Sequence, residues 1–341
     1  MVYIVDPYHI FHETRWNKNL WFGSQTLINL GQIETYLKRS NDYDGILVGS
    51  SYSMNFKGSD LAKAVGAKGV LKLCNGNQSL EMGLMWQRKG LATGKVKHCF
   101  VEIDALRFLR SSDIDSSLEA AKPYINLPYL CLFNLKNLSS LVAFYCILHK
   151  FVPQNDNRFW TWTNLDEVFN WFLYKRKDFK YWIYPDLKKK IVSARSYRNN
   201  HQAVSNQPIA IMRANPLVKF YVFLPAVSLA WNIEYYNYCL TWNRHFITAC
   251  ADLPNVKIYG WHDCAFVSNL ANYYDPGHYH PDINRYMAWC IEHDKHRLTK
   301  ENYDAYEARC VENLRAFKIL DSYPHRDTFD ELVAAEMQDG N

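Results

Sequence analysis

The run Ile46-Leu47-Val48-Gly49-Ser50-Ser51 decides how this chain folds. Three apolar residues follow the turn-forming segment 41–45 and end at a glycine and two serines, a pattern that predicts a buried strand and then a tight turn. A serine at the carboxyl end of such a strand is also a candidate nucleophile. The run therefore predicts both a sheet and a chemical site at its edge.

Similar apolar runs recur along the chain. They lie at 69–74, 96–103, 218–224 and 256–259, and stretches with helical character separate them, beginning with 59–65. Strands separated by helices form a mostly parallel sheet that is covered on both faces. We therefore expect an α/β fold whose active groups gather beyond the carboxyl ends of the strands.

The middle of the chain breaks this alternation. Residues 122–215 are aromatic, basic and helical in character, which predicts an insertion or cap over the sheet, and after Cys290 the sequence becomes helix-forming and acidic. We expect a single α/β domain over 1–290, interrupted by the insertion, and a helical acidic extension over 291–341. A chain of 341 residues that is 48% hydrophobic is long enough to bury a large core.

Positive charge is concentrated in residues 171–200. This segment has nine lysines and arginines against two aspartates, a local net charge of +7 that exceeds the +5 of the whole chain, and aromatic residues are interleaved with them. Such a segment either contacts a polyanion, an anionic glycan or a membrane surface, or is a solvated helical face. No nucleic-acid-binding motif accompanies it, so no nucleic acid partner is expected.

The cysteines and the apolar pattern bear on the compartment. Nine cysteines are scattered along the chain without a C-x-x-C pair, which favours reduced, mostly buried thiols. The start of the sequence lacks the basic and apolar run of a secretory signal, and no stretch of about 18 apolar residues follows. As written, the sequence therefore predicts a cytoplasmic protein, and the alternative is that an N-terminal anchor has been removed.

A second segment complements the serine run. In Tyr274-Asp275-Pro276-Gly277-His278-Tyr279, an aspartate lies three residues before a histidine and can hold the imidazole in one tautomer. Ser51 is then a possible nucleophile for that base. Taken alone, Gly-Ser-Ser is often a turn with a helix cap, and Asp-Pro-Gly is an ordinary turn sequence.

The order of these motifs resembles a known family. Val5-Asp6-Pro7-Tyr8, the 46–51 run and the 274–279 segment are similar to those of the SGNH (GDSL-like) hydrolase superfamily. Within it, the nearest likeness is to the DltD-like and alginate-acetylation-like proteins of bacterial surface-polysaccharide modification. The resemblance implies a three-layer α/β/α sandwich with a mostly parallel, SGNH/flavodoxin-like sheet, and the 122–215 insertion shares little of it.

The resemblance also implies a catalytic triad. Ser51 would attack an acyl carbonyl, His278 would act as general base and then as general acid, and Asp275 would orient the imidazole. The backbone N–H of Ser51 and that of Gly76 would bind the oxyanion, with Asn77 as an accessory donor.

One part of the family pattern is absent. The Gly-x-Asn-Asp block that supplies a side-chain oxyanion donor has no counterpart, because the corresponding strand ends in Phe223-Leu224-Pro225-Ala226-Val227-Ser228. Ser228, Asn232 or Asn55 is expected to substitute. Losing such a donor elsewhere costs roughly 10²- to 10³-fold in rate.

The resemblance does not decide between an esterase and a transferase, or between an enzyme and a non-catalytic protein. It implies an esterase or O-acyl (acetyl) transferase acting on a carbohydrate or polysaccharide, with no bound cofactor and a possible acyl donor such as acetyl-coenzyme A. The alternative is a non-catalytic, SGNH-shaped glycan-binding protein with a vestigial triad. The oligomeric state stays open.

A metal site is a chemical rival to the triad. Asp275, His278 and His280 offer a carboxylate and two imidazoles, and His262 or Asp263 could complete a shell. Alternating residues of an extended segment face opposite ways, however, which argues against this set. The expected site therefore contains no metal, and His280 is expected to precede a helix over 282–292.

Overall fold

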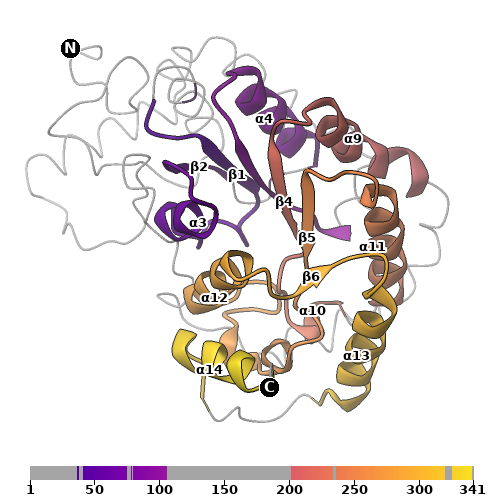
Figure 1. Cartoon of the computed structure of the whole chain (residues 1–341). Coiled ribbons are helices and arrows are strands. Elements are labelled where there is room, and N and C mark those ends of the chain that lie inside the picture. The colour runs from indigo at the N-terminus through magenta and orange to yellow at the C-terminus, as the bar shows by residue number, and fades with distance from the viewer. Residues whose placement is uncertain are drawn as a thin grey trace, which may run out of the picture.

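A six-stranded sheet forms the centre of the fold. The computed structural model describes residues 37, 41–74, 78, 80–105, 201–232, 236–318 and 325–339. The strand order is β2-β1-β3-β4-β5-β6; the first five strands are parallel, and β6 is antiparallel to β5 (Figure 1). The strands are β1 (Gly45–Gly49), β2 (Val70–Cys74), β3 (His98–Glu102), β4 (Lys219–Phe223), β5 (Val256–Tyr259) and β6 (Arg297–Leu298).

The burial of the strands explains why the sequence forms this sheet. Every residue of β1, β2 and β3 is buried, as expected of parallel strands that are covered on both faces. The five strands that the sequence predicts are all present, and the mostly parallel α/β class is confirmed. The two-residue strand β6 is an addition that the sequence analysis missed.

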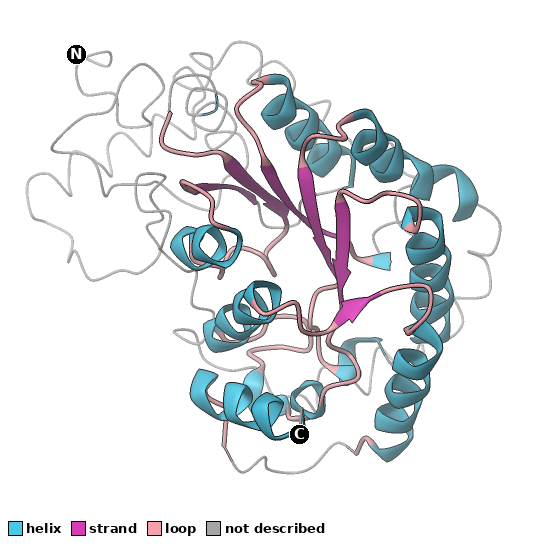
Figure 2. Cartoon of the chain, viewed as in Figure 1, coloured by secondary structure: helices cyan, strands magenta, loops and turns pink. Residues whose placement is uncertain are grey.

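Helices lie on either side of the strands in the view of Figure 1 and are coloured cyan in Figure 2. Helix α4 contacts β1 and α9, which in turn contacts α11, whereas α3 packs against α12 and α12 against α14. The helices are α3 (Gly58–Val65), α4 (Leu80–Ala92), α9 (His201–Ala214), α10 (Leu229–Asn232), α11 (Tyr236–Cys250), α12 (Pro281–Glu292), α13 (Tyr303–Ala316) and α14 (Phe329–Asp339), with 3₁₀ turns η4 (Ala265–Ser268) and η5 (Leu270–Asn272).

The strand order marks one position at the sheet edge. The chain places β2 on one side of β1 and β3 on the other, so the direction of winding reverses between β1 and β3. In open α/β sheets the crevice beyond the carboxyl ends of two such strands is the usual ligand site. Ser50 and Ser51 follow β1 directly, and Glu102 ends β3.

Several expectations lie wholly or partly outside the described residues. The Val5–Tyr8 motif, the basic segment 171–200 and the 122–215 insertion up to residue 200 are among them, while α9 supplies helix over 201–214. In the 291–341 region the structure describes helices α13 and α14. The seven cysteines in the described ranges are all free thiols. Within those same ranges, no helix is long and apolar enough to cross a membrane.

Candidate active site

Ser51 lies in the tight turn that links β1 to α3. The turn is closed by a hydrogen bond from the Ser53 N–H to the Ser50 carbonyl, 3.0 Å long, and a second one joins the Phe56 N–H to the Ser53 carbonyl at 3.2 Å. The backbone N–H of Ser51 donates no hydrogen bond to any of the described residues. A strand–turn–helix geometry of this kind presents a serine hydroxyl at the edge of a sheet.

A buried carboxylate fixes the residues on both sides of Ser51. Glu102, at the end of β3, accepts hydrogen bonds from the Ser50 N–H at 3.0 Å, from the Ser50 hydroxyl at 2.6 Å and from the Ser53 hydroxyl. Gly49 makes room for this arrangement, because a Cβ there would lie 2.9 Å from Glu102 Oε2 and closer still to Ser53 Oγ. The carboxylate therefore couples the carboxyl ends of β1 and β3.

A buried lysine supports the far end of the same turn. Lys72 in the middle of β2 is only 1% exposed, and its Nζ donates to the carbonyls of Phe56 at 2.9 Å and Met54 at 3.3 Å. A buried ammonium is stable only where acceptors replace its water shell. Lys72 thus ties the loop after Ser51 to the strand beside β1.

The second half of the site is a closed loop between η5 and α12. Tyr273 and Tyr279 form an antiparallel bridge, and the Tyr274 N–H donates to the His278 carbonyl at 2.8 Å. Inside this loop, Asp275 Oδ1 accepts from the N–H groups of Gly277 and His278, at 3.0 and 2.9 Å. The Asp-Pro-Gly-His sequence therefore folds into a turn that sets the aspartate against its own histidine.

Ser51, His278 and Asp275 form one continuous chain of hydrogen bonds. The distance from His278 Nε2 to Ser51 Oγ is 2.9 Å, and His278 Nδ1 lies 2.8 and 2.9 Å from the two carboxylate oxygens of Asp275. An ionised carboxylate can only accept, so Nδ1 carries the proton and Nε2 presents its lone pair to the serine. The three residues that the sequence predicts to meet are brought together in the geometry of a base and its nucleophile.

The charge state of Asp275 follows from its surroundings. The residue is 7% exposed, and burial alone would raise its pKa. The hydrogen bonds from His278 and from the N–H groups of His278 and Gly277 outweigh burial, and the net effect lowers the pKa of Asp275. The carboxylate is therefore ionised at neutral pH and can stabilise an imidazolium next to it.

Tyr52 packs against the histidine loop. Its ring lies 5.4 Å from the His278 ring, centroid to centroid, and a Cβ on Gly277 would lie 2.9 Å from its hydroxyl. The residue after the serine thus limits where the imidazole can sit. Gly277 is required because the tyrosine ring occupies the space of a side chain.

Ser228 and Asn55 have structural partners. The Ser228 hydroxyl is 0% exposed and donates to the Pro276 carbonyl at 2.7 Å, and its N–H donates to the same carbonyl at 3.1 Å. Asn55 Nδ2 donates to the Tyr279 carbonyl at 3.1 Å. Both predicted oxyanion donors therefore hold the 275–279 loop in place, and their donating groups point to its backbone.

The other predicted oxyanion residues are not placed. Gly76 and Asn77 lie outside the described residues, as does the side chain of Asn232, which ends α10. Among the predicted oxyanion donors that the structure describes, the backbone N–H of Ser51 is the one that donates no hydrogen bond to a described group.

His280 has a different role from His278. Its Nδ1 accepts from the Asp282 N–H at 3.2 Å and so caps α12, and it also contacts Arg326. Burial and the Arg326 charge lower the pKa of His280 to about 4, and a neutral ring is what the cap requires. Among the described residues, the one group of three His, Cys, Asp or Glu side chains close enough to share a metal ion is Asp263, Cys264 and His296.

Residues that sequence reasoning missed are Glu102 and Lys72. Each is an ionisable residue that directly follows apolar residues of a strand, in Phe100-Val101-Glu102 and Leu71-Lys72-Leu73, and this contrast is visible in the sequence.

Comparison of the chain with family models, curated proteins and solved structures finds no match.

Proposed function

We propose that this chain is a serine-dependent acyl-transfer enzyme of the SGNH type, with Ser51 as nucleophile, His278 as general base and Asp275 as its orienting carboxylate. The observation that carries the proposal is the unbroken Ser51–His278–Asp275 hydrogen-bond chain. The parallel strand order and the position of Ser51 beside the β1–β3 switch point support it. We propose in addition that the helices cover both faces of the sheet in a three-layer α/β/α sandwich.

The chemistry follows from the geometry. Ser51 Oγ attacks the acyl carbonyl while His278 Nε2 takes its proton, and the imidazolium formed is stabilised by Asp275. The Ser51 N–H is available for the oxyanion of the tetrahedral intermediate, because it donates to no other described group. The bond from the carbonyl carbon to the leaving oxygen or sulfur then breaks as His278 protonates that atom, which gives an acyl-Ser51 ester and releases an alcohol from an ester donor or a thiol from a thioester donor.

The acceptor distinguishes an esterase from a transferase. Water or a sugar hydroxyl, deprotonated by His278, attacks the acyl-Ser51 carbonyl and restores the serine. We propose that the acceptor is a carbohydrate hydroxyl of a bacterial surface polysaccharide, with an activated acyl (acetyl) donor such as acetyl-coenzyme A. This assignment rests on the sequence resemblance to polysaccharide-modifying proteins and is an analogy at the level of family.

A fluorophosphonate probe tests the nucleophile. The wild-type protein should be labelled on Ser51, and Ser51→Ala should abolish labelling, whereas Ser59→Ala, which removes an exposed serine of α3 only eight residues away, should leave it unchanged. Circular dichroism confirms that each variant is folded. Labelling that persists in Ser51→Ala would refute the assignment.

The acceptor is tested with the same proteins. Incubation with p-nitrophenyl acetate or acetyl-coenzyme A, with and without an acidic polysaccharide, should produce an acylated sugar and an acyl-Ser51 peptide detectable by mass spectrometry. If the protein reacts with the fluorophosphonate probe but transfers no acyl group to the sugar and only hydrolyses the donor, it is an esterase rather than a transferase. A folded wild-type protein that is not labelled, yet binds the polysaccharide, would establish the non-catalytic glycan-binding alternative.

A further inference from the structure

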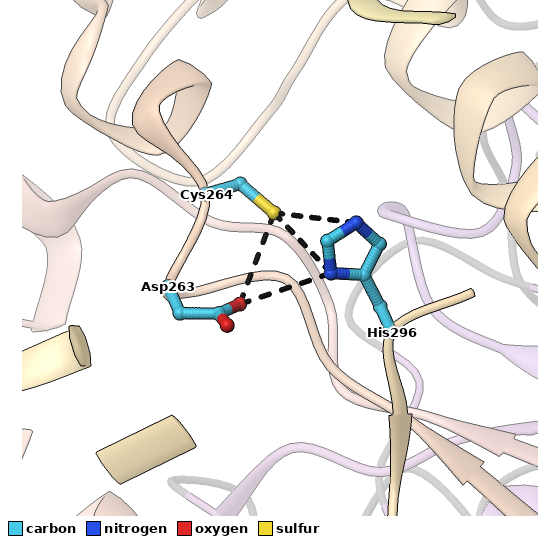
Figure 3. Close-up of side chains that lie close together, drawn as sticks. All are labelled: Asp263, Cys264 and His296. Carbon is cyan, nitrogen blue, oxygen red and sulfur yellow. Dashed lines mark hydrogen bonds and ion pairs between the residues drawn. The ribbon is translucent and has the colours of Figure 1, made fainter. Parts of the chain in front are cut away.

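Asp263, Cys264 and His296 converge at a second position, separate from the serine site. Asp263 and Cys264 lie in the turn after β5, and His296 immediately precedes β6, the antiparallel partner of β5. The Cys264 sulfur lies 3.7 Å from His296 Nδ1 and 3.8 Å from Asp263 Oδ1, and these two atoms are 4.0 Å apart (Figure 3).

The sulfur contacts are long hydrogen bonds, and all three separations are also close to those of atoms that share a metal ion. In a tetrahedral zinc site, bond lengths of about 2.0–2.3 Å place neighbouring ligand atoms roughly 3.3–3.6 Å apart. The observed separations exceed that by a few tenths of an ångström, and the Nδ1–Oδ1 distance of 4.0 Å is too long for a hydrogen bond. A contraction of less than 1 Å at each pair would complete a coordination shell.

The contacts of His296 Nε2 with residues outside the cluster determine which ring nitrogen can bind a metal ion. His296 Nε2 lies 2.7 Å from the Glu336 carboxylate and 3.0 Å from the Tyr286 hydroxyl. With its proton on Nε2, the imidazole keeps the Nδ1 lone pair for a metal ion. Cys264 Sγ lies 3.7 Å from Nδ1 and 3.8 Å from Nε2, so metal binding requires the ring to turn until Nδ1 faces Cys264 and Asp263. A carboxylate on the outer nitrogen of a histidine is the usual second shell of a zinc ligand.

Asp263 is oriented in the same way. Arg309 donates to Oδ2 from Nε at 3.0 Å and from Nη2 at 2.7 Å, and Asn313 holds the Asp263 carbonyl at 2.8 Å. Oδ1 is left toward Cys264 and His296. Lys295 and Arg297 line the same cavity, and Lys295 pairs with Glu336 Oε1 at 3.6 Å.

An open volume adjoins the three donors. Asp263, Cys264 and His296 line a cavity of about 980 Å³, together with Tyr286, Arg309 and Glu336. We infer that Asp263, Cys264 and His296 form a zinc-binding site with three protein ligands, whose fourth position faces this cavity and takes a water molecule. Sulfur, nitrogen and oxygen together are a donor set that Zn²⁺ accepts, and three protein ligands with one open position are typical of zinc sites that bind exogenous ligands.

Binding has a simple proton balance. The Cys264 thiol releases its proton to solvent as the Zn–S bond forms, His296 binds as the neutral imidazole and Asp263 as the carboxylate. Two negative ligands then neutralise the charge of the metal ion. The inference does not depend on the role of Ser51.

Metal content and cobalt spectroscopy test the inference on the full-length chain. Protein treated with chelator, then incubated with ZnCl₂ and desalted, should retain one equivalent of zinc. With CoCl₂ it should show a near-ultraviolet thiolate-to-cobalt charge-transfer band. Cys264→Ser should abolish the band, while Cys239→Ser, which removes the other partly exposed cysteine of the described residues, should retain it.

Further variants separate binding from folding. Asp263→Asn should weaken zinc binding without removing the thiolate band, and Glu336→Gln, which removes the carboxylate beside His296 Nε2, should weaken it about 10- to 100-fold. Absence of stoichiometric zinc and of the cobalt band in folded wild-type protein would overturn the inference. The same holds if Cys264→Ser binds zinc as tightly as the wild type does, because the metal would then sit elsewhere.

Discussion

The Ser50 hydroxyl donates a 2.6 Å hydrogen bond to the Glu102 carboxylate, and this contact joins the residue before the proposed nucleophile to the neighbouring strand. It is a buried, charge-assisted hydrogen bond, a kind that is roughly twice as strong as a neutral one. The position of Ser51 therefore depends on the Glu102 side chain, which is hydrogen-bonded to Ser50 and Ser53 on either side of it.

Removal of Glu102 should affect stability and activity together. In Glu102→Ala the buried Ser50 N–H and hydroxyl lose their acceptor, which is expected to lower the free energy of unfolding by about 1–3 kcal/mol. The rate of fluorophosphonate labelling should fall as well. Glu102→Gln keeps one acceptor oxygen and should be affected less. Urea unfolding measures the first effect and labelling kinetics the second. If Glu102→Ala has the labelling rate and the free energy of unfolding of the wild type, Glu102 does not position Ser51.

Asp275→Asn should slow the reaction of Ser51 by roughly 10³- to 10⁴-fold. The amide can still accept from the N–H groups of Gly277 and His278, but an amide nitrogen facing Nδ1 favours the tautomer with a proton on Nε2, which cannot accept from Ser51. Asp282→Asn is the control, because the Asp282 carboxylate, at the start of α12, contacts Arg326 and not His278. The labelling rate decides: equal rates in both variants would contradict the triad.

Gly49→Ala should destabilise the protein, whereas Gly83→Ala should not. A Cβ at position 49 would be forced against Ser53 Oγ and Glu102 Oε2, while a Cβ at position 83 would meet its nearest atom at an ordinary 3.4 Å. Gly83 lies inside α4, where alanine is favoured over glycine by roughly 0.5–1 kcal/mol. Thermal unfolding should therefore shift in opposite directions for the two variants. Shifts in the same direction would show that the packing around Gly49 can yield.

Stability should fall as the pH drops from about 6.5 to about 4. The pKa of His280 is lowered from 6.5 to about 4 in the folded protein, so over this range the unfolded chain binds more protons. The free energy of unfolding must then decrease as the pH falls. His280→Asn retains an N-cap for α12 but does not titrate, and its stability should depend less on pH over this range. Parallel curves for the two proteins would show that His280 contributes nothing.

The parallel strands and the Asp275–His278 pair can be predicted from the sequence because each is encoded in a short, continuous stretch. Each of the five parallel strands is a short apolar run, and Asp275 and His278 stand in one turn. The meeting of His278 with Ser51 followed from strand order, since the carboxyl ends of parallel strands share one edge of a sheet.

The remaining features depend on contacts that no local pattern encodes. Strand β6 has only two residues, one of them Arg297, and it exists because β5 offers an edge to pair with. Asp263 and His296 meet only through that pairing. Ser228 and Asn55 were predicted as oxyanion donors because they are polar and well placed in sequence, but the carbonyls of Pro276 and Tyr279 receive their hydrogen bonds.

The Ser51–His278 contact spans 227 residues of sequence. We expect such a long-range pair to form late in folding, because the entropy cost of closing a large loop precedes the contact that offsets it. The turn after β1 and the loop before α12 are each held by local hydrogen bonds, but the turn carries Ser51 without its base and the loop carries His278 and Asp275 without the serine. Ser51 would therefore become reactive only when the loop that carries His278 docks against it. Labelling of Ser51 would then report completed folding, and an incompletely synthesised chain would be unreactive.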